Sequence, residues 1–180
     1  MDDFELKTEM VKNITTAVAL MVVWIVTGCG YHLKGAGLEP PEGVKSIAIP
    51  VLENQTAESG IETLFTGDLI YEFTRSKVVE IVDEPEADAV LKGSIRSLDV
   101  DTVAHTTAYF SDIQRVRVRL DLQLKGADGR VLWSVRGISD NEPFQVSGDR
   151  RATDRNKRDA IALISERLAE KVHTRILEDF

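Results

Sequence analysis

Apolar and polar residues alternate without exception across residues 115–124, which read RVRVRLDLQL. Alternation with a period of two places every second side chain on the same face of a β-strand. The residues GADG that follow favour a tight turn. The chain then resumes the alternation with Val131, Trp133 and Val135 on one face. We therefore predict a β-hairpin over residues 115–136.

Further alternating segments predict additional strands. Apolar residues alternate from Ile47 to Val51. Pro50 has no N–H to donate, so this strand either forms an edge of the sheet or ends there. A second strand is predicted over residues 89–98, and an additional short strand over 78–82.

A repeat of about four residues predicts two amphipathic helices. Between Ile61 and Phe73 an apolar residue recurs at every fourth position. A longer helix is predicted over residues 153–177, where Thr153 or Asp154 offers an oxygen to the first free backbone amides. Its apolar stripe consists of Ile161, Ile164, Leu168, Val172 and Ile176.

The order of elements is β-α-β-β-β-α. A sheet with one apolar face must be covered, and two amphipathic helices are able to cover it. We predict an α+β fold: a two-layer sandwich with a mostly antiparallel sheet of about four strands, covered on one face by two helices. It forms a single domain over residues 44–180.

The N-terminal region has the features of an export signal. The uncharged run from Ile14 to Val26 is too short to span a bilayer comfortably, and Lys12 precedes it, as in a secretory signal. Val-Thr-Gly-Cys, ending at Cys29, resembles the lipobox of bacterial lipoproteins. We predict a signal peptide over residues 1–28 and covalent diacylglyceryl and acyl groups on Cys29. The alternatives are an ordinary transmembrane anchor and a buried core helix.

Two details refine this interpretation. Residues 1–9 carry four acidic residues and one lysine, which is the wrong charge for the start of a signal peptide. We therefore expect that translation begins at Met10 or that the first nine residues are a tolerated extension. Gly30 follows the cysteine where Asp would mark inner-membrane retention, which predicts the outer membrane. Residues 29–43 are rich in Gly and Pro and are predicted to be a lipidated tether.

Composition argues against several classes of function. The 180 residues carry a net charge of −8, and the segment after residue 28 has 20 basic and 26 acidic residues. An acidic domain is a poor general binder of nucleic acid. Cys29 is the only cysteine, so the chain has no internal disulfide and no thiolate metal site.

No catalytic motif is evident, and we predict no enzyme activity, no cofactor and no metal. The chain lacks a nucleophile elbow and a phosphate-binding glycine loop. His32, His105 and His173 are scattered along the sequence. His105 could be grouped with Asp99 and Asp101, but a solvated loop is the better interpretation of that segment.

The predicted strands instead gather cations on one face. When apolar side chains face the helices, basic ones on the same strands face outward. One interpretation is a surface for an anionic partner such as phosphate, which guanidinium groups bind in a forked geometry. The other is a solvated face balanced by Asp121 and nearby acids. The candidate residues are Lys92, Arg96, Arg115, Arg117, Arg119 and Arg136.

Several segments resemble, in order, the LptE family of lipopolysaccharide-assembly lipoproteins. They read CGYHLKG, SIAIPVLENQTAESGIETLFTGDLIYEF, EADAVLKGSI and GRVLW, followed by the closing amphipathic helix. The resemblance covers nearly all of residues 29–180. It implies an α/β sandwich and an outer-membrane lipoprotein that plugs the β-barrel translocon LptD. With LptD it would insert lipopolysaccharide into the outer leaflet, and the family is expected to bind lipopolysaccharide through basic residues.

A second class remains open. IAIPVLENQT followed by a helix also resembles other envelope lipoproteins, including activators of peptidoglycan synthases and curli-secretion components. These would be binding modules for a murein synthase or a secretion pore. The CGYHL start and the closing RDAIALISERLAEKV helix favour the LptE family.

Overall fold

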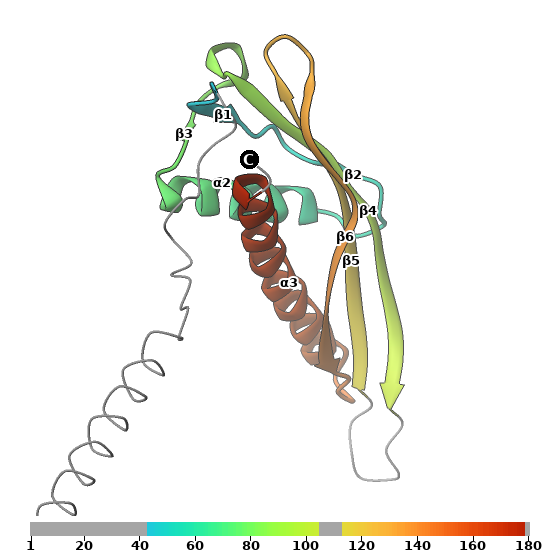
Figure 1. Cartoon of the computed structure of the whole chain (residues 1–180). Helices are drawn as coiled ribbons and strands as arrows, with labels where there is room; N and C mark the ends of the chain where they lie inside the picture. The colour runs from blue at the N-terminus through green and yellow to red at the C-terminus, as the bar shows by residue number, and fades with distance from the viewer. Residues whose placement is uncertain (1–42, 105–112, 179–180) are drawn as a thin grey trace, which may run out of the picture. The chain divides into compact units, whose positions relative to one another are not determined.

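The computed structural model describes residues 43–104 and 113–178 (Figure 1). The chain divides into two units, residues 1–37 and 38–180, and every described residue belongs to the second. The predictions for the signal peptide, Met10, Cys29, His32 and His105 lie outside the described residues. The elements are β1 (Ser46–Ala48), β2 (Glu53–Asn54), α2 (Ile61–Ser76), β3 (Glu80–Ile81), a short 3-10 helix (Glu84–Glu86), β4 (Ala89–Ala104), β5 (Ile113–Gly126), β6 (Val131–Gln145) and α3 (Arg150–Glu178).

The described strands form one six-stranded sheet in the order β3-β1-β4-β5-β6, with β2 also paired to β4. The three long strands are antiparallel, whereas β1 runs parallel to β3 and β4. The predicted α+β sandwich with a mostly antiparallel sheet is therefore confirmed. The additional short strand predicted over 78–82 is β3. The sheet has one strand more than predicted because β2 has two residues, too few to produce a clear alternation.

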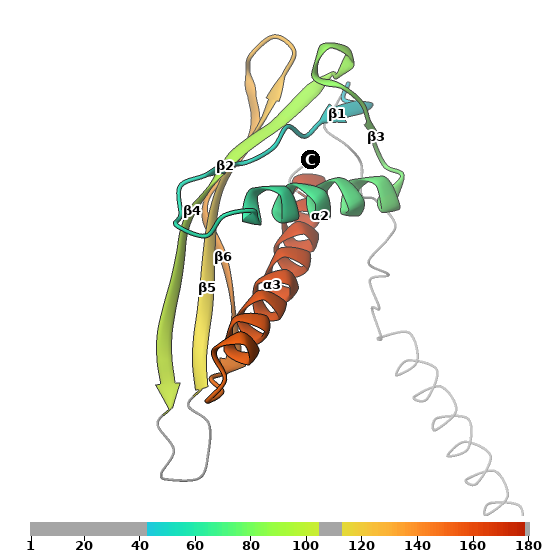
Figure 2. The same cartoon turned by 180° about the vertical axis from the view of Figure 1, so that it is seen from behind.

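Both helices lie on one face of the sheet, as Figure 2 shows from behind. α3 packs against β6, β5 and α2. Alternate residues of β5 and the apolar stripes of both helices form the core between the two layers. Its fully buried large side chains are Ile47, Phe65, Leu69, Phe73, Leu91, Ile95, Leu120, Leu122, Leu124, Ile161, Ile164 and Leu168.

The N-terminal strand ends where proline requires it to end. β1 stops at Ala48, before Pro50, and it lies inside the sheet between β3 and β4. Ile47 and Ile49 are buried as predicted, but Val51 is 65% exposed. The period of two fails at Val51 because the chain has already left the strand.

The long strands exceed their predicted ranges. The segment 99–104, interpreted from sequence as a loop, is the second half of β4. It pairs in register with β5, so that Asp99 lies opposite Arg117 and Asp101 opposite Arg115. A bulge between Ile95 and Ser97 interrupts the earlier alternation, which is why the pattern seemed to end near residue 98.

α3 begins earlier than predicted, and a different residue caps it. The Asp149 carboxylate accepts a hydrogen bond of 2.9 Å from the Arg151 N–H at the start of the helix. The Thr153 hydroxyl instead accepts a 2.9 Å hydrogen bond from the Ser147 N–H. The predicted cap at Thr153 or Asp154 is therefore wrong, because both residues already lie inside the helix.

Ion pairs fix the middle of α3 to the helix-facing side of β6. Asp140 Oδ2 lies 2.9 Å from Arg167 Nε and 3.0 Å from Lys171 Nζ. The second carboxylate, Glu142, pairs with Arg167 at 2.8 Å. Burial raises the pKa of Asp140, but hydrogen bonds from the Asn141 N–H, Lys171 and Arg167 outweigh it, and the pKa is lowered. These ion pairs thus hold the C-terminal half of α3 against β6, while α2 packs against another side of the helix.

Candidate anion-binding surfaces

The six cations predicted from the strands do share the outer face of the sheet. In β5 the intervening residues Val116, Val118 and Leu120 are buried against the helices, so the arginines between them point outward. We call this set the outer-face cations: Lys92, Arg96, Arg115, Arg117, Arg119 and Arg136.

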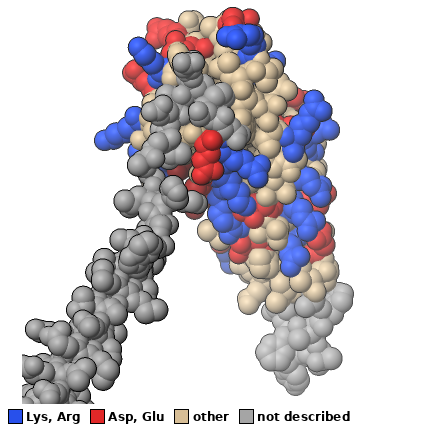
Figure 3. Space-filling view, in the orientation of Figure 1, with Lys and Arg blue, Asp and Glu red and all other residues tan. Residues whose placement is uncertain are grey.

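Carboxylates match most of these cations. Figure 3 shows basic and acidic side chains interleaved along the right-hand side, where the long strands lie. Such contacts between partly exposed groups each contribute little to stability, but they reduce the charge that the face presents. The ion pairs are Arg119–Asp99 at 3.0 Å, Arg117–Asp101 at 3.9 Å, Arg96–Asp121 at 3.3 Å and Lys92–Glu84 at 2.5 Å.

A groove of about 800 Å³ lies on this outer face. It crosses β4, β5 and β6 and is bounded by the loop that follows β1, including the exposed Val51. Lys92, Arg96 and Arg136 line it, whereas the three arginines of β5 do not. Arg136 has no ion-pair partner within the described part of the chain, so the groove keeps one unmatched guanidinium.

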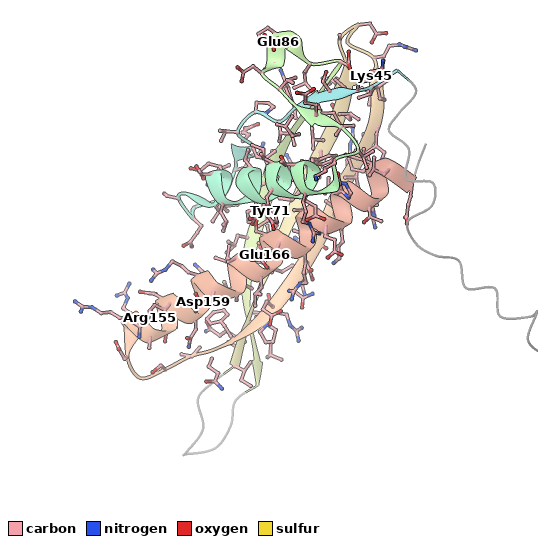
Figure 4. The ribbon with its side chains drawn as sticks, turned by 90° about the vertical axis from the view of Figure 1, so that its left-hand side faces the viewer. Lys45, Tyr71, Glu86, Arg155, Asp159 and Glu166 are labelled. Carbon is pink, nitrogen blue, oxygen red and sulfur yellow. The ribbon has the colours of Figure 1, made fainter. Side chains whose placement is uncertain are left out.

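A second basic surface, which the sequence analysis missed, lies at the N-terminal end of α3. Arg151, Arg155 and Arg158 follow one another at i, i+4 and i+7, which places them on one face of the helix. We call them the arginine stripe. Among residues 43–104 and 113–178, none of their side chains has an ion-pair or hydrogen-bond partner. Figure 4 shows Arg155 on the part of α3 that extends beyond α2.

The position of Arg151, in the first turn of α3, is electrostatically unfavourable for the helix. Cations near a helix N-terminus oppose the macrodipole, and the first turn of α3 contains no acidic residue. Nearby Lys157 differs, because it pairs with Glu58 at 2.5 Å. The sequence signal was available in RRATDRNKR, which carries five cations between residues 150 and 158. The helix was predicted from its apolar stripe, and no site was predicted on its polar face.

Five turns further along, the same helix face is covered. Ala169 and His173 lie 18 residues beyond Arg151 and Arg155, and both are buried. The ring of His173 packs edge-on against Phe73 of α2 at a centroid distance of 5.0 Å. Its Nε2 atom is buried without a hydrogen-bond partner, and burial lowers the pKa of the imidazole. α2 therefore covers this face at the C-terminal half of α3 and leaves it to solvent at the other.

A metal site and a membrane-spanning helix would each require a particular arrangement of the described residues. Within 43–104 and 113–178, no group of three or more His, Cys, Asp or Glu side chains is arranged to hold a metal ion. No helix in the described part of the chain has the length and apolar character needed to cross a membrane. What the geometry does offer is two clusters of guanidinium groups, which bind phosphates and carboxylates.

This α+β sandwich occurs in several bacterial lipoproteins. A minor lipoprotein of Acinetobacter baumannii superposes with a TM-score of 0.57 and 12% identity, covering 75% of this chain and 92% of that one. Uncharacterised lipoprotein B of Nitrosomonas europaea gives 0.56 and 12%, covering 82% and 90%. A protein of Xanthomonas campestris gives 0.53 and 14%, covering 78% and 90%. At these identities the likeness establishes the shared fold alone.

The sequence supplies the family. The model of the LptE family, described as lipopolysaccharide-assembly, matches residues 44–176, and the chain belongs to this family. The resemblance noted from the motifs is thereby confirmed. A comparison with curated proteins finds no match.

Proposed function

We propose that this chain is a lipid-anchored outer-membrane protein that partners an LptD-type β-barrel. It plugs the barrel and assists the insertion of lipopolysaccharide into the outer leaflet, and it binds lipopolysaccharide directly. The observation that carries this proposal is the match of the lipopolysaccharide-assembly family over residues 44–176. The family is one of lipoproteins that act by binding, which agrees with a surface built from cations rather than from catalytic groups.

The anchor in this proposal is Cys29. It follows a short apolar run and a lipobox-like sequence, and each acyl methylene buried in a membrane contributes about 0.8 kcal/mol. Cys29→Ala removes the thiol that accepts the diacylglyceryl group. We expect this variant to lose label from a metabolically incorporated fatty acid and to leave the outer-membrane fraction. Retention of the label would show that the lipid is attached elsewhere.

Lipopolysaccharide binding is assigned to both basic surfaces, with different weights. Phosphate groups accept forked hydrogen bonds from guanidinium. The arginine stripe is free to make them, because its side chains have no partner in the described residues. Arg117 and Arg119 first have to leave Asp101 and Asp99. We therefore assign the larger share of binding to the stripe and a smaller share to the outer-face cations.

Co-purification tests the partner. The full-length lipoprotein, extracted in mild detergent after cross-linking in cells, is expected to bring down a large β-barrel protein. Cys29→Ala serves as the matched control for contacts that depend on the anchor. Recovery of a murein synthase or a secretion pore in place of a barrel would contradict the proposal and favour the alternative binding-module function.

A further inference from the structure

Among the described residues, only the first half of β4 has strand neighbours on the side away from β5. The last backbone hydrogen bond on that side, of 3.0 Å, runs from the Gln55 N–H to the Ile95 carbonyl oxygen, and the Arg96 guanidinium donates a hydrogen bond to Gln55 Oε1 beside it. From Ser97 to Val103, no strand among the described residues pairs on that side (Figures 1 and 2). The paired residues are Ala89 and Val90 with β1, and Ser94 and Ile95 with β2. We call residues 97–103 the open edge of β4.

The other edges of the sheet are protected against pairing along their length, whereas the open edge of β4 is irregular at its ends alone. β3 is only two residues long. β6 is distorted at Gly137, whose φ is 66°, and it carries Pro143, which has no N–H. Short strands, bulges, prolines and lysines are the usual means of blocking an edge. The open edge reads SLDVDTV and contains no proline or lysine, although its pairing with β5 shifts register at its two ends, between Ile95 and Ser97 and between Thr102 and Ala104. Val100 and Val103 on it are 42% and 45% exposed.

A second copy of the chain is a poor occupant of this edge. Antiparallel pairing of two such edges centred on Val100 would place Asp99 of one copy directly opposite Asp101 of the other. Like charges directly opposite one another are destabilising. Parallel pairing in register would place each aspartate beside its own equivalent. The two carboxylates therefore disfavour self-association and point to an occupant of opposite charge.

The two faces of the open edge define the chemistry of that occupant. On the helix-facing side, Leu98 and Val100 lie opposite Val118 and Val116 of β5, and they would contact apolar side chains of an added strand. On the outer side, the Asp99 and Asp101 side chains are 46% and 50% exposed. Asp101 is only loosely engaged, since its contact with Arg117 is 3.9 Å long. An added strand must alternate apolar and basic residues.

We propose that the open edge of β4 binds an extended segment of a partner protein by β-strand addition, and that apolar residues alternate with lysine or arginine in this segment. In strand addition, main-chain hydrogen bonds supply affinity and alternate side chains supply specificity. The edge would extend the sheet beyond β2 without displacing any described element. This surface is distinct from the groove and from the arginine stripe, and it does not depend on lipopolysaccharide binding.

A designed peptide tests the proposal on the full-length lipoprotein in detergent. The probe is a fluorescent nine-residue peptide in which lysine and valine alternate. One comparison peptide has the same composition with its lysines and valines in separate blocks, and another has glutamate in place of lysine. Fluorescence anisotropy should show binding of the alternating lysine peptide alone. The block peptide controls for attraction of any cationic peptide to a chain of net charge −8.

Val100→Lys places a cation on the edge and should weaken binding of the alternating peptide about fivefold. Val131→Lys is the matched control, because Val131 is 52% exposed on β6 and gains the same charge. It should leave peptide affinity unchanged. Val103→Lys provides a second test on the same edge if Val100→Lys does not fold.

Three results would overturn the proposal. The first is equal binding of the alternating and block peptides, and the second is equal loss of affinity in Val100→Lys and Val131→Lys. The third is a dimer of the full-length protein, measured by light scattering, that Val100→Lys dissociates while the peptide does not bind. That result would assign the edge to a second copy of the chain.

Discussion

The outer face of the sheet and the N-terminal half of α3 both gather arginines, yet they present them differently. Each arginine near the middle of β5 has an aspartate on the neighbouring strand, and Arg119 approaches Asp99 to 3.0 Å. The arginine stripe has no such partners in the described residues. Its first member, Arg151, also lies in the first turn of α3, where the helix dipole disfavours positive charge. The fold satisfies most of the charge on the outer face and none of the charge of the arginine stripe within the described residues.

This difference separates what a basic cluster contributes to folding from what it offers to a ligand. A matched cation exchanges one partner for another when it binds an anion, so the net gain is small. An unmatched cation breaks no existing ion pair when it binds an anion, and the anion also reduces the repulsion between this cation and its neighbours. Counting arginines on a face therefore overstates its capacity to bind anions. Unmatched arginines are the better guide.

The largest expected effect is a loss of lipopolysaccharide binding when the stripe is reversed. Arg151→Glu with Arg155→Glu should weaken binding at least about tenfold, because a hydrogen bond to a charged group is worth about 1.5–3 kcal/mol. The measurement is binding of the purified protein to lipopolysaccharide at low salt, where charges are screened least. Lys45→Glu with Arg130→Glu makes the same change in net charge away from both surfaces and should bind normally. An equal loss of lipopolysaccharide binding in the two double variants would show that the effect comes from net charge alone.

On the part of this α3 face that α2 covers, His173 should make the free energy of unfolding depend on acidic pH. Burial is the main cause that lowers the pKa of His173; Glu72 and Glu170 oppose the shift, and Arg75 adds to it. Below about pH 6.5 the unfolded chain binds a proton that the folded chain does not. The contribution of neutral His173 to the free energy of unfolding is therefore fully present above that pH. It falls as the pH decreases toward the lowered pKa, by at most about 1.4 kcal/mol per pH unit.

Urea unfolding at pH 7.5 and pH 5.5 tests this sign. The wild-type midpoint should be lower at pH 5.5, and His173→Leu should remove most of the difference. Carboxylates with lowered pKa values, such as Asp140, lose their stabilising charge only at more acidic pH. They therefore do not confuse the comparison. An unchanged pH dependence in His173→Leu would show that another group is responsible.

The sequence predicted the regular parts of the fold because their patterns are long. The helix from Ile61 and the strand segment 115–124 have uninterrupted periodicity. The return strand was predicted from three alternating residues, of which Trp133 is buried and Val131 is exposed. β2 is too short to produce a period. The parallel pairing of β1 with β3 is set by the helix that crosses between these strands. The bulge at residues 95–97 shifted the alternation by one, so the second half of β4 read as a loop.

The sequence predicted on which face the candidate arginines lie, but not which carboxylates pair with them. Alternation alone put Arg115, Arg117 and Arg119 on the outer face. The ion pairs of Arg117 and Arg119 depend on the register that brings Asp101 and Asp99 beside them, which no single-strand pattern contains. Whether the stripe is exposed depends on how far α2 extends along α3, and this is a property of tertiary packing. The local sequence fixes charge, while long-range contacts decide whether the charge is available.

The outer face should show a smaller binding effect than the stripe. Arg96→Glu with Arg117→Glu is expected to weaken lipopolysaccharide binding about two- to threefold, because both arginines already have carboxylate partners. Barrel co-purification of the same variant separates lipid binding from docking. A loss of the barrel with normal lipid binding would assign this face to the partner. A loss of lipid binding as large as that of the stripe variant would refute the distinction between matched and unmatched arginines.

The smallest expected effects are changes in stability of opposite sign. Arg151→Glu places an acid in the first turn of α3, which should raise the free energy of unfolding by about 0.3–1 kcal/mol. Arg119→Glu removes the partner of Asp99 and sets two carboxylates side by side, which should lower it by a similar amount. Both arginines are exposed, so packing changes little and the charge environment decides the sign. Urea midpoints at low salt would show the two shifts, and both should shrink in about 1 M salt, where charges are screened within about 3 Å. Shifts of the same sign would mean that the two surfaces do not differ in the way their arginines are satisfied.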